Sequence, residues 1–309
     1  MKLRGIGQEW VVAATLLILL LVLAFAAPSF FQRQPLLSLA AREAPTLIVS
    51  CGIALVIICR EIDISIGSLF SVCGVVGALL CTLNWPLALA LPLSVACGAI
   101  MGAINGALVA GLRLPSIVVT LATMVFWREG LRWIRQGQFV NVPDGIQWFG
   151  LSQAAGQIVI IFSTCLVFAI LAFASRFVAG LRFIYAIGSD HESARLAGIR
   201  TQFVTFLMFV GMGALASLAA TLNLVQSPQA DPKAGTGLEL KAIAAAVVSG
   251  IAITGGRGKL WGIIAGVALL GCIGPALTHL HVQAYWEKAL QGFIILGAIT
   301  AEHFRQKRK

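Results

Sequence analysis

Apolar runs of roughly 15 to 25 residues recur along the whole chain, each about the length that a helix needs to cross a bilayer. Short polar loops separate these runs, and none of the loops is long enough to form a soluble domain. The pattern predicts an all-α fold, a polytopic transmembrane helical bundle of about ten spans in a single transmembrane domain, 1–309. The predicted spans are 10–27, 44–59, 68–83, 86–110, 115–133, 157–175, 203–225, 240–254, 260–278 and 285–301.

Composition agrees with a membrane protein, because 59% of the 309 residues are apolar, 11% are charged and the mean hydropathy is +0.94. Soluble domains carry about 25% charged residues. The first apolar run, 10–27, follows a basic start but has no clear cleavage site before Pro28. We therefore interpret it as a retained first span and not as a signal peptide.

The distribution of Lys and Arg predicts the orientation. If Met1 is cytoplasmic, fourteen of the 22 basic residues fall in cytoplasmic loops or termini and eight fall on the opposite side. This bias follows the positive-inside rule and predicts that both termini are cytoplasmic, which requires an even number of spans. It also explains the chain's net charge of +10, because the basic residues cluster at span ends. Nucleic acid is therefore not needed as a partner.

The polar segment 176–200 contains the signature of a short helix. Ser189 is a suitable N-cap, Glu192 stands three residues later as in a capping box, and Gly198 is suited to the C′ position. The helix between them, 190–197, would have about two turns and a length of roughly 12 Å. A short capped helix between apolar spans is suited to docking into a partner, although an ordinary amphipathic connector remains an alternative.

A second polar cluster follows the second span. Arg60, Glu61 and Asp63 lie within four positions, with Ser65 shortly after, between two apolar stretches. Charges in such a place are costly unless they reach water or one another. A re-entrant element lining a cavity and a tight polar turn at the interface both fit this pattern.

Two glycine triplets indicate close helix packing. The fourth span carries Gly98, Gly102 and Gly106, with Asn105 beside the last of them, and the ninth repeats the spacing with Gly258, Gly262 and Gly266. Small residues four apart let helix backbones approach closely. The two triplets fall in corresponding spans if the fold consists of two halves of five, which indicates an internal repeat.

Charges near the outer ends of two spans give further expectations. Arg128 and Arg132 lie four apart on the fifth span, which opens at Pro115, and we expect them to contact lipid headgroups or form a gate. The loop 226–241 is rich in Pro and Gly and should be extracytoplasmic, with Thr236 and Glu239 capping the helix that follows.

No catalytic, nucleotide or metal motif is visible. GGRGKL (255–260) fails as a phosphate loop, because Ile253 stands where the first Gly is needed and Leu260 follows the Lys. The seven Cys form no metal-ligand spacing and are read as apolar filler. By the predicted span bounds all twelve carboxylates fall at span ends or in loops and none in mid-span, so the energy source for any transport is expected outside this chain.

Six motifs in order resemble the permease subunits of bacterial ABC importers for monosaccharides, of the ribose, rhamnose and autoinducer-2 type. They are REIDISIGSL (60–69), GAINGALV (102–109), PSIVVTLATM (115–124), GSDHESARLAGI (188–199), GTGLEL (235–240) and KAIAAAVVSGIAITGGRGKLWG (241–262). The resemblance covers residues 10–301 and is much more specific for the family than for the solute.

The resemblance implies an inner-membrane permease that is not an enzyme. It pairs with an identical or homologous permease, a cytoplasmic ATPase that binds ATP and Mg²⁺, and a periplasmic sugar-binding protein, with membrane lipid around it. It further implies that the short helix couples to the ATPase, and that a second set of polar residues borders the translocation path. The coupling residues are Gly188, Ser189, Asp190, Glu192, Ala194, Arg195, Leu196, Gly198 and Ile199, and the path residues are Glu61, Asp63, Ser65 and Asn105.

The chain departs from the family pattern at two places. Ser189-Asp190 stands where the family usually has Gly-Asn, and Arg128-Glu129-Gly130 replaces an Arg-Gly pair. A stand-alone secondary transporter or facilitator is the alternative function, and a polytopic membrane enzyme is a third.

Overall fold

The computed structural model describes residues 8–279, 282–283 and 285–307, and it is an all-α bundle as predicted. Each predicted span overlaps one helix. The long helices are α1 (Gln8–Ala26), α2 (Arg33–Ile58), α3 (Ile66–Thr82), α4 (Leu87–Gly106), α5 (Ser116–Arg135), α6 (Gln153–Phe177), α9 (Thr201–Leu224), α10 (Leu238–Val248), α11 (Trp261–His279) and α12 (Trp286–Lys307). Shorter elements are η1 (Pro28–Phe31), η2 (Ala107–Gly111), η3 (Gln147–Gly150), α7 (Ala179–Ser189), α8 (His191–Leu196), β1 (Val140–Asn141) and β2 (Gln229–Ala230).

Within these described residues, five helices are long and apolar enough to cross a membrane. They are α2, α4 with its extension η2, α6, α9 and α11, and α1 and α3 supply shorter apolar helices. Ten crossings therefore stay a prediction.

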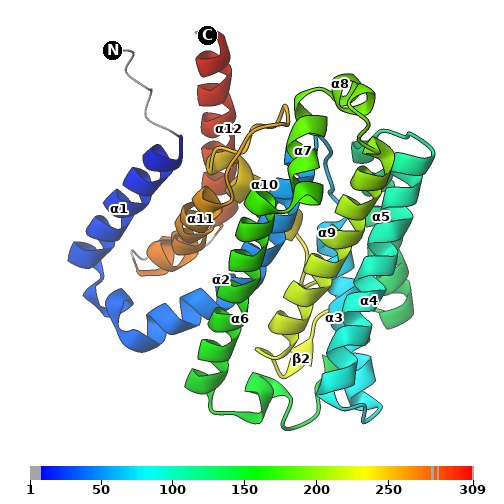
Figure 1. Cartoon of the computed structure of the whole chain (residues 1–309). Helices are drawn as coiled ribbons and strands as arrows, with labels where there is room; N and C mark the ends of the chain where they lie inside the picture. Colours follow the sequence, from blue (N-terminus) through cyan, green and yellow to red (C-terminus); the bar gives the residue numbers. More distant parts are fainter. Residues whose placement is uncertain (1–7, 280–281, 284, 308–309) are drawn as a thin grey trace.

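The bundle has two distinct ends (Figure 1). One end carries α8, and α1 begins and α12 ends toward it; the opposite end carries the antiparallel pair β1–β2, in which Val140 lies opposite Ala230. We call these the α8 end and the β end. The basic residues Lys2, Arg4, Arg308 and Lys309, which contribute to the predicted orientation, lie outside the described residues.

Helix α2 forms the centre of the bundle. It is apolar on all sides and almost entirely buried from Ala44 to Ile58, where α6, α9, α10 and α11 pack around it. A helix without a polar face is stable only when other elements surround it. The first eleven residues of α2, which contain Arg33, Arg42 and Glu43, lie ahead of the predicted span and are helical as well.

The glycines of α4 face α9 at very short range. A Cβ on Gly98 or Gly102 would overlap backbone oxygens of α9, and Gly213 of α9 lies opposite them. The second triplet is different. Gly258 lies in the loop before α11 with φ +149°, so only Gly262 and Gly266 are helical, and Gly266 faces α10. The expectation of a matching helical triplet was therefore wrong at Gly258.

The helices from α2 to α5 nevertheless pack in the same pattern as those from α9 to α12. In this comparison α2 corresponds to α9, α3 to α10, α4 to α11 and α5 to α12. Helix α3 packs on α9, α4 and α5, while α10 packs on α2, α11 and α12. Helix α4 packs on α9, and α11 packs on α2. Because α2 runs toward the α8 end and α9 runs away from it, the two halves are related as an inverted repeat.

Two interrupted helices meet inside this repeat. The segment 59–65 leads from the α8 end into α3, and the segment 225–237 leads from the β end into α10. Their backbones touch at Gly67 and Gly235, where a Cβ on either residue would overlap the carbonyl oxygen of the other. The N–H of Gly235 also donates to the Ser71 hydroxyl (3.0 Å). Only glycine permits this approach of two backbones.

Candidate functional site

Asp190 is the N-cap of α8, directly before the first helical residue, His191. The Asp190 carboxylate accepts a hydrogen bond from the N–H of Ser193 (2.8 Å), and this bond to the backbone holds the pKa of the Asp190 carboxyl below its ordinary value. The prediction that Ser189 is the N-cap was wrong by one residue. The reason is that α7 continues through Ser189, whose hydroxyl donates back to the carbonyl of Tyr185 (2.8 Å).

The far end of α8 is closed by a Schellman motif. Gly198 has φ +85°, its N–H donates to the carbonyl of Arg195 (3.0 Å), and the N–H of Ile199 donates to the carbonyl of Ala194 (3.1 Å). Gly198 thus occupies the C′ position that its sequence context predicts. Both ends of this two-turn helix are fixed by hydrogen bonds.

The outward face of α8 is free to contact a partner. Ala194 is buried against the bundle, whereas Leu196 is 78% exposed. Glu192 does not complete a capping box, because its carboxylate pairs with Arg195 instead (2.6 Å). Glu192, Arg195 and Leu196 therefore present one negative, one positive and one apolar side chain to the exterior.

The end of α7, which leads into α8, packs against two other segments. Gly188 lies directly against the carbonyl of Ile58 at the end of α2, and that carbonyl accepts from the N–H of Gly256 in the loop before α11 (2.8 Å). A Cβ at position 188 would overlap both backbones. The end of α7, directly ahead of α8, therefore contacts both the end of α2 and the loop before α11.

A cavity of about 770 Å³, which we call the polar cavity, lies beside α8. It is bounded by Glu61 from the loop after α2, by Arg113 and Ser116 from the connection between η2 and α5, and by His191 and Arg195 from α8. Of the four predicted path residues, Glu61 borders this cavity.

The other three predicted path residues lie together but fully buried. Asp63 accepts from the N–H (2.8 Å) and the hydroxyl (2.6 Å) of Ser65, and the amide of Asn105 donates to that hydroxyl (2.8 Å). The structure thus joins Asp63 and Ser65 to Asn105 of α4. In this conformation they do not line an open path.

Asp63 and Ser65 belong to the segment 59–65, which turns at Arg60 and then runs extended into the bundle as far as the start of α3. The N–H of Ile62 donates to the Ser116 hydroxyl and that of Ile64 to the Thr120 hydroxyl, both at 3.2 Å. Two hydroxyls one turn apart on α5 therefore satisfy backbone groups of an extended chain, which a membrane interior requires.

Two ion pairs inside the bundle were missed by the sequence reading. Arg128 Nη2 lies 3.1 Å from Glu239 Oε1, and Lys241 Nζ lies 2.7 and 2.9 Å from the two carboxylate oxygens of Glu43. We call these the central ion pairs. Both carboxylates are buried, and Glu239 also lies against Gly67, at the meeting point of α3 and α10.

The position of these pairs corrects two expectations. Glu43 lies fifteen residues before the end of α2, which places it roughly 22 Å from the α8 end at 1.5 Å per residue. Carboxylates therefore do occur well inside the helices. Glu239 does not cap α10 with Thr236; the N-cap is Gly237, with φ +86°.

Arg128 and Arg132 do not act together, although they share a face of α5. Arg132 binds both oxygens of Glu129 (3.0 Å), and this pair is exposed. A signal for the missed pairs was present in the sequence, because Glu239 and Lys241 stand two apart at the start of an apolar span. Opposite charges inside apolar sequence are expected to find partners.

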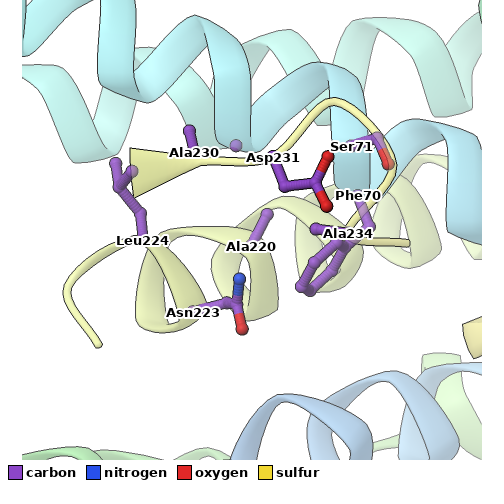
Figure 2. A pocket seen from close by; sticks show the side chains of 9 residues that line it. Phe70, Ser71, Ala220, Asn223, Leu224, Ala230, Asp231 and Ala234 are labelled. Carbon is purple, nitrogen blue, oxygen red and sulfur yellow. The ribbon is translucent and has the colours of Figure 1, made fainter. Parts of the chain in front are cut away.

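A very small pocket lies toward the β end, between α3, α9 and the segment after β2 (Figure 2). Its lining includes Phe70, Asn223 and Asp231, and its volume of about 10 Å³ corresponds to one water molecule. A monosaccharide does not fit there. Within the described residues no group of three or more metal-ligating side chains occurs.

Comparison with known proteins decides the family. Residues 36–299 match the family model described as "Branched-chain amino acid transport system / permease component". The chain belongs to this permease family. It is thus a membrane transport subunit, and such a subunit is not itself catalytic.

Individual relatives extend over nearly all of the permease. It is 30% identical over 296 residues to the ribose import permease protein of Escherichia coli K12, covering 94% of this chain and 92% of the relative. It is 28% identical to the ribose import permease protein of Haemophilus influenzae over 299 residues, with 95% and 93% covered. It is 32% identical over 289 residues to the autoinducer 2 import system permease protein of Shigella flexneri, with 92% and 84% covered. No solved structure matches this chain.

Proposed function

We propose that this permease is the membrane subunit of an ATP-driven (ABC) importer for a monosaccharide or a similar polar solute in a bacterial inner membrane. The observation that carries the proposal is α8, a helix fixed at both ends, exposed on its outer face and joined to α7, whose last residues lie against the end of α2. Relatives whose printed names describe ribose and autoinducer 2 import support the solute class.

In this proposal the α8 end faces the cytoplasm, and both termini lie on that side. Arg60, Arg113, Arg176, Arg182, Arg195, Arg200, Arg257 and Lys259 lie in loops and helix ends there, as the positive-inside rule requires. A cytoplasmic ATPase binds α8 and supplies ATP and Mg²⁺ sites, a second permease completes the path, and a periplasmic binding protein docks at the β end.

The coupling mechanism follows from the contacts at the base of α8. Movement of α8 shifts Gly188, which moves the carbonyl of Ile58 and with it the start of the segment 59–65. That segment is held to α5 through the hydroxyls of Ser116 and Thr120, so its displacement changes how α3 and α5 lie against each other. The polar cavity, bordered by Glu61, forms the cytoplasmic part of the path.

A stand-alone secondary transporter is the second candidate. The observation in its favour is that the central ion pairs place two carboxylates inside the bundle. Carboxylates inside a membrane protein are typical of ion-coupled transport. Each carboxylate here is already paired with a cationic side chain of the same chain, however, so neither is an unpaired charge in the bundle.

Affinity purification of the tagged permease from its native membrane tests the proposal. We expect an ATPase to co-purify, and we expect replacement of Glu192, Arg195 and Leu196 by Ser to remove it while the permease remains inserted. The matched control is a triple Ser replacement of exposed residues at the β end, Gln138, Phe139 and Asn141. A permease that purifies without any ATPase, or an ATPase retained by the α8 variant, would contradict the proposal.

A further inference from the structure

An apolar groove of about 800 Å³ runs along the outside of the bundle toward the α8 end. Helix α2 forms its floor, α6 and α9 form its walls, and α7 crosses its end. Its lining includes Gly52, Leu171, Leu181, Phe203, Leu207 and Gly211. We call it the lipid groove.

The groove has the length of one membrane leaflet. Its lining on α9 extends from Arg200 to Leu215, which is roughly 22 Å at 1.5 Å per residue. Half of a bilayer's hydrocarbon core measures about 15 Å. The groove therefore reaches from the α8 end to about the bilayer midplane.

The walls of the groove leave real space for an occupant. A Cβ built on Gly180, Gly198 or Gly211 meets no atom within 4 Å. Polar side chains are almost absent from the lining, so a sugar would find no hydrogen-bond partners in it. A hydrocarbon chain suits both the shape and the chemistry.

One arginine lines the end of the groove and a second lies next to the lining in the sequence. Arg200 belongs to the lining and also borders the polar cavity, and Arg182 stands on α7 between the lining residues Leu181 and Phe183 without lining the groove itself. Both are exposed, and neither takes part in an ion pair within the part of the chain that the structure describes. Arginine pairs well with phosphate because it donates two parallel hydrogen bonds.

We propose that this groove binds one anionic phospholipid from the leaflet at the α8 end. Its acyl chain lies between α6 and α9, and its phosphate contacts Arg182 and Arg200. Basic sites between helices on the cytoplasmic side of membrane proteins recognise anionic headgroups in this way. Because α7 leads directly into α8, the bound lipid also fixes the position of α8 relative to the membrane.

Native mass spectrometry of the full-length permease tests the proposal. The protein is delipidated in detergent and titrated with palmitoyl-oleoyl phosphatidylglycerol, or with phosphatidylcholine that carries the same acyl chains. We expect one tightly retained phosphatidylglycerol. Replacing both Arg182 and Arg200 by Gln should weaken it by about fivefold for each lost charge and weaken phosphatidylcholine much less, because choline balances the charge of its phosphate.

A second variant tests the hydrocarbon part of the site. Gly211→Leu places a side chain in the open groove and should weaken both lipids. Gly130→Leu on α5, where a Cβ also meets no atom within 4 Å, is the matched control and should weaken neither. The double Gln variant alters exposed side chains only, so it remains informative if Gly211→Leu misfolds.

Three results would overturn the proposal. Equal retention of both lipids by the wild-type permease would rule out a site that selects an anionic headgroup. Unchanged lipid retention in the Gly211→Leu variant would place the lipid elsewhere. A permease dimer that dissociates in that variant would show a second copy as the occupant. None of these readouts depends on transport, so they stand apart from the proposed function.

Discussion

Replacing Lys241 by Met leaves the buried carboxylate of Glu43 without its closest cation. The Lys241 side chain is 19% exposed and that of Glu43 is 10% exposed, so water can screen the remaining charge only in part. Removing one partner of a buried ion pair usually costs about 3 to 5 kcal/mol. Arg42 Nε lies 3.7 Å from the same carboxylate and offsets some of this loss.

We therefore expect Lys241→Met to destabilise the permease by about 2 kcal/mol or more. At roughly 2 to 4 °C per kcal/mol for a domain of this class, the unfolding midpoint should fall by about 4 to 8 °C. The measurement is thermal unfolding of the permease in lipid nanodiscs, followed by tryptophan fluorescence at one fixed heating rate, because large membrane proteins often unfold irreversibly.

The double variant Glu43→Gln with Lys241→Met separates the lost pair from lost packing. It removes both charges, so we expect most of the stability to return. Lys233→Met, in the exposed segment after β2, is the control and should unfold like the wild type. A Lys241→Met midpoint within 1 °C of wild type, or a double variant as unstable as the single one, would refute the assigned role of this pair.

The remaining predictions concern α8 and the seam between α4 and α9. Replacing Glu192 and Arg195 together by Ala should uncouple ATP hydrolysis from uptake while leaving the permease inserted, because both side chains lie on the exposed face of α8. Gly102→Leu should destabilise the permease by at least about 1 to 3 kcal/mol, because its Cβ would overlap the backbone of α9. Asp190→Asn should keep coupling, since Asn caps a helix as well as Asp, whereas Asp190→Leu should reduce it.

Each of these predictions has its own check. Coupling is read as the ratio of solute moved to ATP hydrolysed in proteoliposomes, and a normal ratio in the double Ala variant contradicts docking through α8. For the seam, Gly111→Leu, where a Cβ meets no atom within 4 Å, should melt like wild type. Equal melting of Gly102→Leu and Gly111→Leu would argue against the seam.

The cap also has a defined pH dependence. The folded pKa of Asp190 is lowered by the Ser193 N–H, so the cap stabilises α8 above the ordinary pKa of an Asp and is lost as the pH falls through the lowered value. Because the ordinary Asp pKa is about 3.9 and that of Asp190 is lower still, Asp190 should add no pH dependence to coupling between about pH 6 and 8. A loss of coupling in that range that Asp190→Asn abolishes would contradict this assignment.

The positions of the helices could be predicted from the sequence because long apolar runs must be helical in a membrane. The prediction was least accurate where charged residues continue a helix. Helix α2 begins at Arg33 and not at residue 44, since its charged first turns lie ahead of the apolar run. Helix α7 was missed for a similar reason, because Arg182 interrupts its apolar residues.

The candidate site shows where local patterns stop being sufficient. Ser189 and Asp190 are both good caps, and the choice between them depends on how far α7 extends. Glu43 and Lys241 are 198 residues apart, so no local spacing indicates that they pair. Their contact exists because the inverted repeat brings α10 against α2, an arrangement that a single sequence does not specify.

Uptake of a monosaccharide into proteoliposomes tests the central claim most directly. The permease is reconstituted with its co-purified ATPase and binding protein, and radiolabelled ribose is offered with ATP, with a non-hydrolysable ATP analogue, or without nucleotide. The proposed function predicts accumulation of a solute of this class against a gradient only with ATP, and only with an intact α8. Equilibration of the sugar by the permease alone, without nucleotide, would contradict it and establish a facilitator.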